Sequence, residues 1–283
     1  MDKILTLLDG SAYSESVCHH TAWIAGRLGA EVEALHVLGR REGAAPSDLS
    51  GTLRLGARSA LLQELATLDE SRARLAQARG HAILEDAKAI LERDGVAGVT
   101  TRLRRGDLLE AVRALEPEIR AITLGKRGEG ADFASGHLGS NLERIVRSTR
   151  VPVFVAARDF RPITSVLLAY DGSASARVAV DRMAASPVFK GLAVTVVCVA
   201  EEDAGIREDV DQVVQRLSGA GMTAEGRVLP GSPEEVLAQV MTDAGADLLV
   251  MGAYGHSRIR ALIIGSTTTA LIQTVRAPVL LYR

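Results

Sequence analysis

The chain has 283 residues, of which 47% are hydrophobic and 3% aromatic, and it carries a net charge of −2. This length suggests one large or two ordinary domains, and the near-neutral charge gives no reason to expect nucleic acid or an anionic membrane surface as a partner. No apolar run reaches the roughly 18–20 residues of a membrane span.

The N-terminal residues 1–5 lead directly into a strand pattern without the features of a signal peptide. Cys18 and Cys198 lie in apolar helix and strand patterns, as buried cysteines do in a reducing compartment. The histidines lack the spacing of a zinc site, so we expect no metal held by the protein alone. Together these features predict a cytoplasmic protein.

The order of predicted elements repeats along the chain. A buried strand pattern over 4–8 is followed by Asp9-Gly10-Ser11, a helix pattern over 17–28 and a strand pattern over 32–38. The same series starts again 162 positions later with a strand over 166–170 and Asp171-Gly172-Ser173. Self-similarity over so many landmarks predicts two copies of one domain.

Alternating strands and helices predict an α/β fold in which each copy has a five-stranded parallel sheet. We place the domains at 1–157 and 163–283, with 158–162 as linker. Later landmarks repeat at an offset of 125, so copy one carries 37 extra residues, near 39–80. Their second part has helical period, and we favour a helix covering the groove between the domains. The alternative is a lid whose Arg54 or Arg58 reaches a ligand.

Glycines follow the buried strand pattern at 248–251 and return before a helix pattern that begins with Gly265-Ser266-Thr267. Glycine lets backbone N–H groups approach a bound group, and a helix N-terminus suits phosphate. The segment is not a P-loop, because no Gly-Lys-Ser/Thr follows the spacer. The glycine spacing also differs from the dinucleotide-binding fingerprint.

The spacing Gly252-x2-Gly255-x9-Gly265-Ser266, closed by Ala-Pro-Val-Leu-Leu at 277–281, resembles the ATP-binding signature of the universal stress protein family. The resemblance covers nearly the whole chain in tandem form. It implies two Rossmann-like domains of the adenine-nucleotide alpha hydrolase type, packed as a pseudo-dimer. It also implies an adenine-nucleotide site in copy two, made by Asp171, Val199, Met251, Gly252, Gly255, Gly265, Ser266 and Thr267.

Two of these residues have a second interpretation. By the resemblance Asp171 accepts a hydrogen bond from the adenine amino group, but it also suits the cap of a helix starting near Ala174. Met251 packs near the nucleoside or belongs only to the core.

Copy one has matching positions at Asp9, Val37, Gly125, Gly128, Gly139 and Ser140. Its spacer has ten residues instead of nine, and Asn141 stands where copy two has Thr267. Lys126 and Arg127 add positive charge that would favour phosphate. This first site binds ATP, binds a different nucleotide or anion, binds only weakly, or is empty.

We expect ATP to bind with Mg²⁺ neutralising its phosphates, and the protein to act in the stress response as a nucleotide-gated regulatory or interaction module. A slow ATPase and a nucleotide-independent scaffold are the alternatives. We assign no catalytic residue: Asp247 lies at the opposite end of its strand from the phosphates, and His256 is interpreted as an ordinary loop residue. The terminal strands at 151–156 and 279–282 are sheet edges that invite pairing, within the chain or also in a homodimer.

Overall fold

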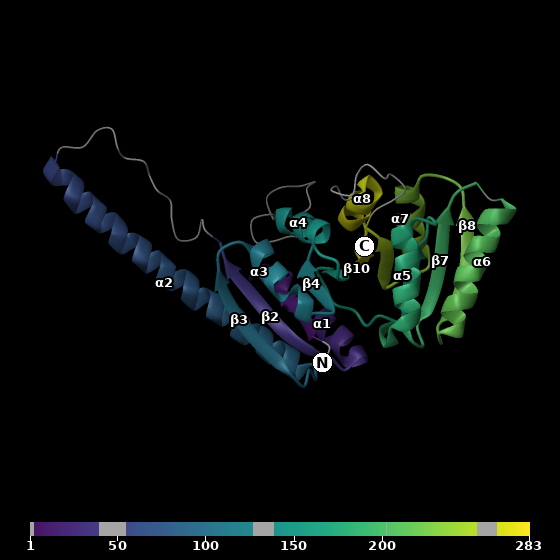
Figure 1. The fold of residues 1–283 in the computed structure, drawn as a ribbon, viewed down its shortest axis with the longest axis horizontal. Coiled ribbons are helices and arrows are strands. Elements are labelled where there is room, and N and C mark those ends of the chain that lie inside the picture. Colours follow the sequence, from purple (N-terminus) through teal and green to yellow (C-terminus); the bar gives the residue numbers. More distant parts are fainter. Residues whose placement is uncertain (1–2, 40–54, 127–138, 202, 254–264) are drawn as a thin grey trace.

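The computed structural model describes residues 3–39, 55–126, 139–201, 203–253 and 265–283. Within them the chain forms one ten-stranded sheet of order β3-β2-β1-β4-β5-β10-β9-β6-β7-β8 (Figure 1). Each half contributes five strands that run parallel, and the two sets have the same order, third-second-first-fourth-fifth. The predicted α/β fold of two repeated parallel sheets is therefore confirmed.

The strands are β1 (Lys3–Leu7), β2 (Glu31–Leu38), β3 (Val99–Arg105), β4 (Ala121–Gly125), β5 (Val153–Ala156), β6 (Ser165–Ala169), β7 (Ala193–Val199), β8 (Thr223–Leu229), β9 (Leu248–Gly252) and β10 (Val279–Tyr282). The helices are α1 (Ser14–Leu28), α2 (Leu55–Arg93), α3 (Leu108–Leu115), α4 (Ser140–Ser148), α5 (Ala174–Ala185), α6 (Ala204–Gly219), α7 (Pro233–Asp243) and α8 (Ser266–Thr274). The described residues also include the short 3₁₀ helices η1 (Glu116–Glu118) and η3 (Pro187–Phe189).

Helices cover both faces of the sheet and produce two hydrophobic cores. One core takes its helical side chains from α1, α2, α5 and α6. The other takes them from α3, α4, α7 and α8. Each core includes residues of both halves, so apolar packing continues across the middle of the molecule and holds the halves together.

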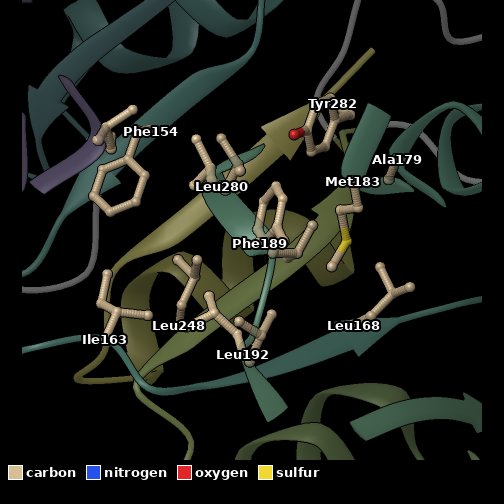
Figure 2. Close-up of a cluster of buried hydrophobic side chains, with 14 of the residues drawn as sticks. Phe154, Ile163, Leu168, Ala179, Met183, Phe189, Leu192, Leu248, Leu280 and Tyr282 are labelled. Carbon is tan, nitrogen blue, oxygen red and sulfur yellow. The ribbon is translucent and has the colours of Figure 1, made fainter. Parts of the chain in front are cut away.

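The halves meet where β5 and β10 pair antiparallel, with Leu280 opposite Phe154. Figure 2 shows these two side chains beside each other, and the apolar cluster continues to Phe189 and Leu248. Both strands are four residues long and buried throughout. The edge strands of the two five-stranded sets therefore pair with each other within the chain, so neither edge is left open to solvent.

Helix α2 lies at the far end of the sheet from this junction. Its C-terminal part packs on β2, β3 and α1, and at Gly80 a Cβ would lie 2.7 Å from Leu103 Cδ1. Its N-terminal part extends beyond the sheet (Figure 1). The expectation that this helix covers the groove between the domains is therefore wrong. Arg54 and the side chain of Arg58 lie outside what the structure describes.

None of the helices in the described ranges combines the length and apolar character that crossing a bilayer requires.

Candidate functional site

The candidate site of the second half lies where strand order switches, between β6 and β9. These strands are parallel neighbours, with Ala169 beside Met251, so the residues that follow them emerge at the same edge of the sheet. In open α/β sheets, ligands bind in the crevice outside the carboxyl ends of the strands at such a switch. Asp171 follows β6 and Gly252 ends β9, so the structure brings these two predicted site residues to one edge.

Asp171 shapes the turn that leads into α5. Its Oδ1 accepts a hydrogen bond from the Ser173 N–H at 3.0 Å, across Gly172 with a φ of 70°. The cap of α5 is Ser173, whose Oγ accepts from the Ala176 N–H at 3.3 Å. The helix-cap interpretation of Asp171 is therefore wrong. Asp171 is exposed and lies directly after the carboxyl end of β6.

A second carboxylate, which the sequence analysis missed, lies close to this turn. The position of a Cβ on Gly172 is 3.6 Å from Asp209 Oδ2, which accepts from the Tyr170 hydroxyl at 2.9 Å and from Arg177 Nη2 at 3.3 Å. Burial, and next the hydrogen bond to Asp209, raises the pKa of Tyr170 to about 12. Tyr170 is thus a neutral hydrogen-bond donor that fixes Asp209 near the loop after β6.

Packing against α5 explains why residue 252 is a glycine. A Cβ there would lie 2.3 Å from Ser175 Oγ and 3.0 Å from the backbone nitrogen of Ala176. Only glycine lets the first turn of α5 approach the end of β9 so closely. This close approach narrows the distance between the two strand-end loops that would hold a ligand.

The loop after β9 is closed by hydrogen bonds at its two ends. The Gly265 N–H donates to Ala253 O at 3.4 Å, and Thr268 Oγ1 donates to Gly252 O at 3.5 Å. Gly265 is the N-cap of α8 and makes no side-chain cap bond. The first N–H groups of α8 have no intrahelical acceptors and carry partial positive charge, which suits an anion. Gly255 lies outside the described residues.

The hydroxyl of Thr267 contacts a carboxylate that the sequence analysis also missed. Thr267 Oγ1 donates to Glu234 Oε1 at 3.0 Å, and Ser232 Oγ donates to Glu234 Oε2 at 3.1 Å. The bond from Thr267, followed by the bond from Ser232, lowers the pKa of Glu234. An ionised carboxylate from α7 therefore lies beside the start of α8. The sequence does carry a signal for it: Ser232-Pro233 is a typical helix start, and the first turn of that helix includes Glu234.

Val199 and Met251 belong to the strands on either side of β6. Val199 ends β7 and is half-buried. Met251 is 6% exposed and is part of the hydrophobic core under α7 and α8.

In the first half, different side chains surround the turn that follows the first strand. Asp9 Oδ1 accepts from the Ser11 N–H at 3.0 Å, as Asp171 does from Ser173. The position of a Cβ on Gly10 is 2.6 Å from Ile83 Cδ1 and 3.6 Å from Arg79 Nη2. The matching position on Gly172 has Asp209 Oδ2 at 3.6 Å and Arg177 Nη2 at 3.9 Å, so the first half has an apolar side chain of α2 where the second half has a carboxylate.

The remaining predicted residues of the first half are distributed over three elements. Val37 lies on β2 and is half-buried, and Gly125 ends β4. Gly139 is the N-cap of α4, and Ser140 is its first residue. Gly128 and Arg127 lie outside the described residues, as does the side chain of Ser140.

Lys126 does not serve the site that its position in the sequence suggested. Its side chain is buried, and its Nζ donates to Val275 O at 2.5 Å, at the C-terminal end of α8. Burial lowers the pKa of this ammonium from 10.5 to about 8. The prediction that Lys126 adds charge for a phosphate in copy one is therefore wrong, because its charge is directed at the other half.

A second cation makes the reciprocal contact. Arg283 Nη1 donates to Arg147 O at 2.7 Å, near the C-terminal end of α4. Each of the two helices that follow the glycine loops therefore ends on a cation from the opposite half, a position favoured by the helix dipole.

The repeated strand order and the helices on both faces of the sheet define a doubly wound α/β protein built as an internal tandem. Residues 1–157 and 162–283 each match the Universal stress protein family. The chain therefore belongs to that family.

Relatives support this assignment over the full length. The chain is 38% identical over 287 residues to the universal stress protein Slr1230 of Synechocystis sp., covering 100% of both chains. Its fold is similar to that of a universal stress protein from Archaeoglobus fulgidus, with a TM-score of 0.71, 17% identity, and coverage of 100% of this chain and 96% of the other. A universal stress protein from Pseudomonas aeruginosa gives a TM-score of 0.64 at 15% identity, with coverage of 100% and 93%.

Proposed function

We propose that the second half binds ATP or a related adenine nucleotide in the crevice between the ends of β6 and β9. The observation that carries this proposal is the convergence of Asp171 with the N-terminus of α8 at one switch point. Asp171 and Asp209 offer acceptors to an adenine amino group, and the first turn of α8 offers N–H groups to phosphate. Mg²⁺ would arrive with the nucleotide, held mainly by phosphate oxygens.

We propose that the nucleotide acts on the contact between the halves. The helix α8 supports this idea, because it begins at the candidate phosphate site and ends at Val275, which accepts from Lys126. A rigid helix transmits a small shift at one end to the other. On this proposal the protein is a regulatory interaction module of the stress response, built of domains 1–157 and 163–283, with α2 as an insertion in the first.

The first half is proposed to bind a different or weaker ligand. In this half, Ile83 and Arg79 lie near Gly10, in the turn after β1. An arginine favours an anion or a hydrogen-bond acceptor over the adenine amino group, which is a donor. At the equivalent place the second half presents the Asp209 carboxylate, to which Arg177 is paired.

Gly265 provides a clean test of the second site. Among the described residues, the heavy atom nearest to a Cβ at Gly265 is Thr268 Oγ1, at 3.4 Å. The φ of Gly265 is −57°, which other residues adopt readily. Gly265→Glu places a negative charge at the start of α8, whereas Gly265→Ala adds only a methyl group. Isothermal titration with Mg²⁺-ATP should give binding for wild type and Gly265→Ala, and little or none for Gly265→Glu.

Equal heats from wild type and Gly265→Glu, or none from either, would contradict the site. The alternatives are separated by two further outcomes. Steady ATP turnover that is lost in Gly265→Glu favours the slow ATPase, which would need a positioned water or nucleophile. An interaction with partner proteins that is unchanged by ATP and by Gly265→Glu favours the nucleotide-independent scaffold.

A further inference from the structure

Helix α2 carries an unusual stripe of leucines. Among the described residues, the large hydrophobic side chains that are exposed are Leu68, at 49%, and Leu75, at 71%. They are seven residues apart and therefore on one face of the helix. Leu65 and Arg72 complete a spacing of three and four residues, which is that of a coiled-coil seam. We call Leu65, Leu68, Arg72 and Leu75 the leucine stripe.

The stripe lies on the part of α2 that extends away from the body (Figure 1). Within the described ranges, the helix contacts the body at Gln77, whose Oε1 accepts from Arg105 Nη2 at 3.0 Å, and at the buried Gly80. At a rise of about 1.5 Å per residue, residues 55–76 span roughly 33 Å before this contact. A helix is marginally stable without tertiary packing, so a segment of this length with an apolar seam calls for a partner helix.

Charge along the segment identifies that partner. The charged residues within 63–70 are all acidic, and those within 71–79 are all basic. Two copies aligned antiparallel therefore place acidic residues against basic ones, whereas a parallel pair places like charges together. The ion pair within the helix between Arg74 Nη2 and Glu70 Oε1, at 2.6 Å, joins two exposed side chains and is readily exchanged for an intermolecular one.

We propose that the chain forms a homodimer through antiparallel pairing of residues 63–79 with the same segment of a second copy. In the usual layers of such a seam, Leu65 packs against Leu75 of the partner subunit, and Leu68 packs against the aliphatic part of the partner's Arg72. This interface is separate from the β5–β10 junction and from the nucleotide crevice, so it does not depend on the proposed ligand.

The first experiment measures the mass of the full chain by sedimentation equilibrium over a wide concentration range. We expect a dimer for wild type. Leu68→Lys with Leu75→Lys should raise the dissociation constant by at least about a hundredfold, since four exposed leucines leave the contact. The control, Ala66→Lys with Ala73→Lys, adds the same charge on another face of α2 and should remain dimeric. Unfolding curves should show that both variants stay folded.

A monomeric wild type would overturn the proposal, and so would a leucine variant that dimerises as strongly as wild type. The direction of pairing is tested by disulfide formation between variants. A mixture of Leu65→Cys and Leu75→Cys should cross-link more than either variant alone. Cross-linking of each variant mainly with itself would overturn the antiparallel arrangement.

Discussion

Lys126 makes the stability of the molecule depend on pH in a way that one substitution can isolate. Lys126→Met removes the ammonium from the junction while keeping a side chain of similar length. Burial lowers the folded-state pKa from 10.5 to about 8. Because the folded-state pKa is the lower one, protonation of Lys126 favours the unfolded chain. Its contribution to stability is fully present above about pH 10.5, falls between 10.5 and 8, and is constant below about pH 8.

The size of the effect follows from the shift. One pKa unit corresponds to about 1.4 kcal/mol, so the full change is about 3 kcal/mol, and about 2 kcal/mol of it falls between roughly pH 7 and 9.5. Urea unfolding of wild type and Lys126→Met at these two pH values measures it. The free energy of unfolding of wild type minus that of the variant should rise by about 2 kcal/mol at the higher pH.

The control is Arg283→Met, which removes the reciprocal cation from Arg147 O. A guanidinium stays charged throughout this range, so its difference from wild type should be the same at both pH values. A difference for Lys126→Met that is also independent of pH would refute the burial of the ammonium at the end of α8.

Three further substitutions or reactions test the site and the core. Gly252→Ala places a Cβ 2.3 Å from a side-chain oxygen of α5, so urea unfolding should show a loss of about 1–3 kcal/mol in the free energy of unfolding. The control Gly265→Ala should change this free energy little, and equal effects of the two substitutions would contradict the close packing at Gly252. Glu234→Gln removes a negative charge beside the start of α8, so calorimetry should show ATP binding about three- to tenfold tighter, and weaker binding would count against a phosphate there. Burial raises the pKa of the Cys18 thiol to about 12, so a thiol reagent near neutral pH should label it only on unfolding, and fast labelling in the native protein would disagree.

The sequence was informative about features that repeat or that depend on local geometry. The offset of 162 between the two Asp-Gly-Ser segments predicted the tandem fold. The glycines at 252 and 265 predicted the ends of a loop that the structure joins through Ala253 O. These features were accessible because strand period, turn residues and helix starts are encoded over a few neighbouring residues.

Contacts between distant segments were not accessible in the same way. Lys126 meets Val275 across 149 positions, and Glu234 meets Thr267 across 33. A sequence shows that a lysine follows a strand, but not which helix end lies opposite. The helical period near 55–93 likewise indicated α2, yet period alone gives no direction for a helix that leaves the edge of a sheet. For that reason the expectation that α2 covers the groove between the domains was wrong.

The contacts at the junction make the two halves unequal. The position that follows β9 is Ala253, which corresponds to Lys126 after β4 and has no cation to offer α4. The helix α4 ends instead on the exposed Arg283, and an exposed contact to a carbonyl contributes little. The contact of α8 with Lys126 is desolvated, and a buried polar group left without its partner is costly. A displacement of α8 would therefore affect β4 of the first half through a strong contact, whereas a displacement of α4 would affect β10 only through a weak one. Under the proposed function, nucleotide in the second site is linked most strongly to the loop of the first site, and that linkage acts equally in the reverse direction.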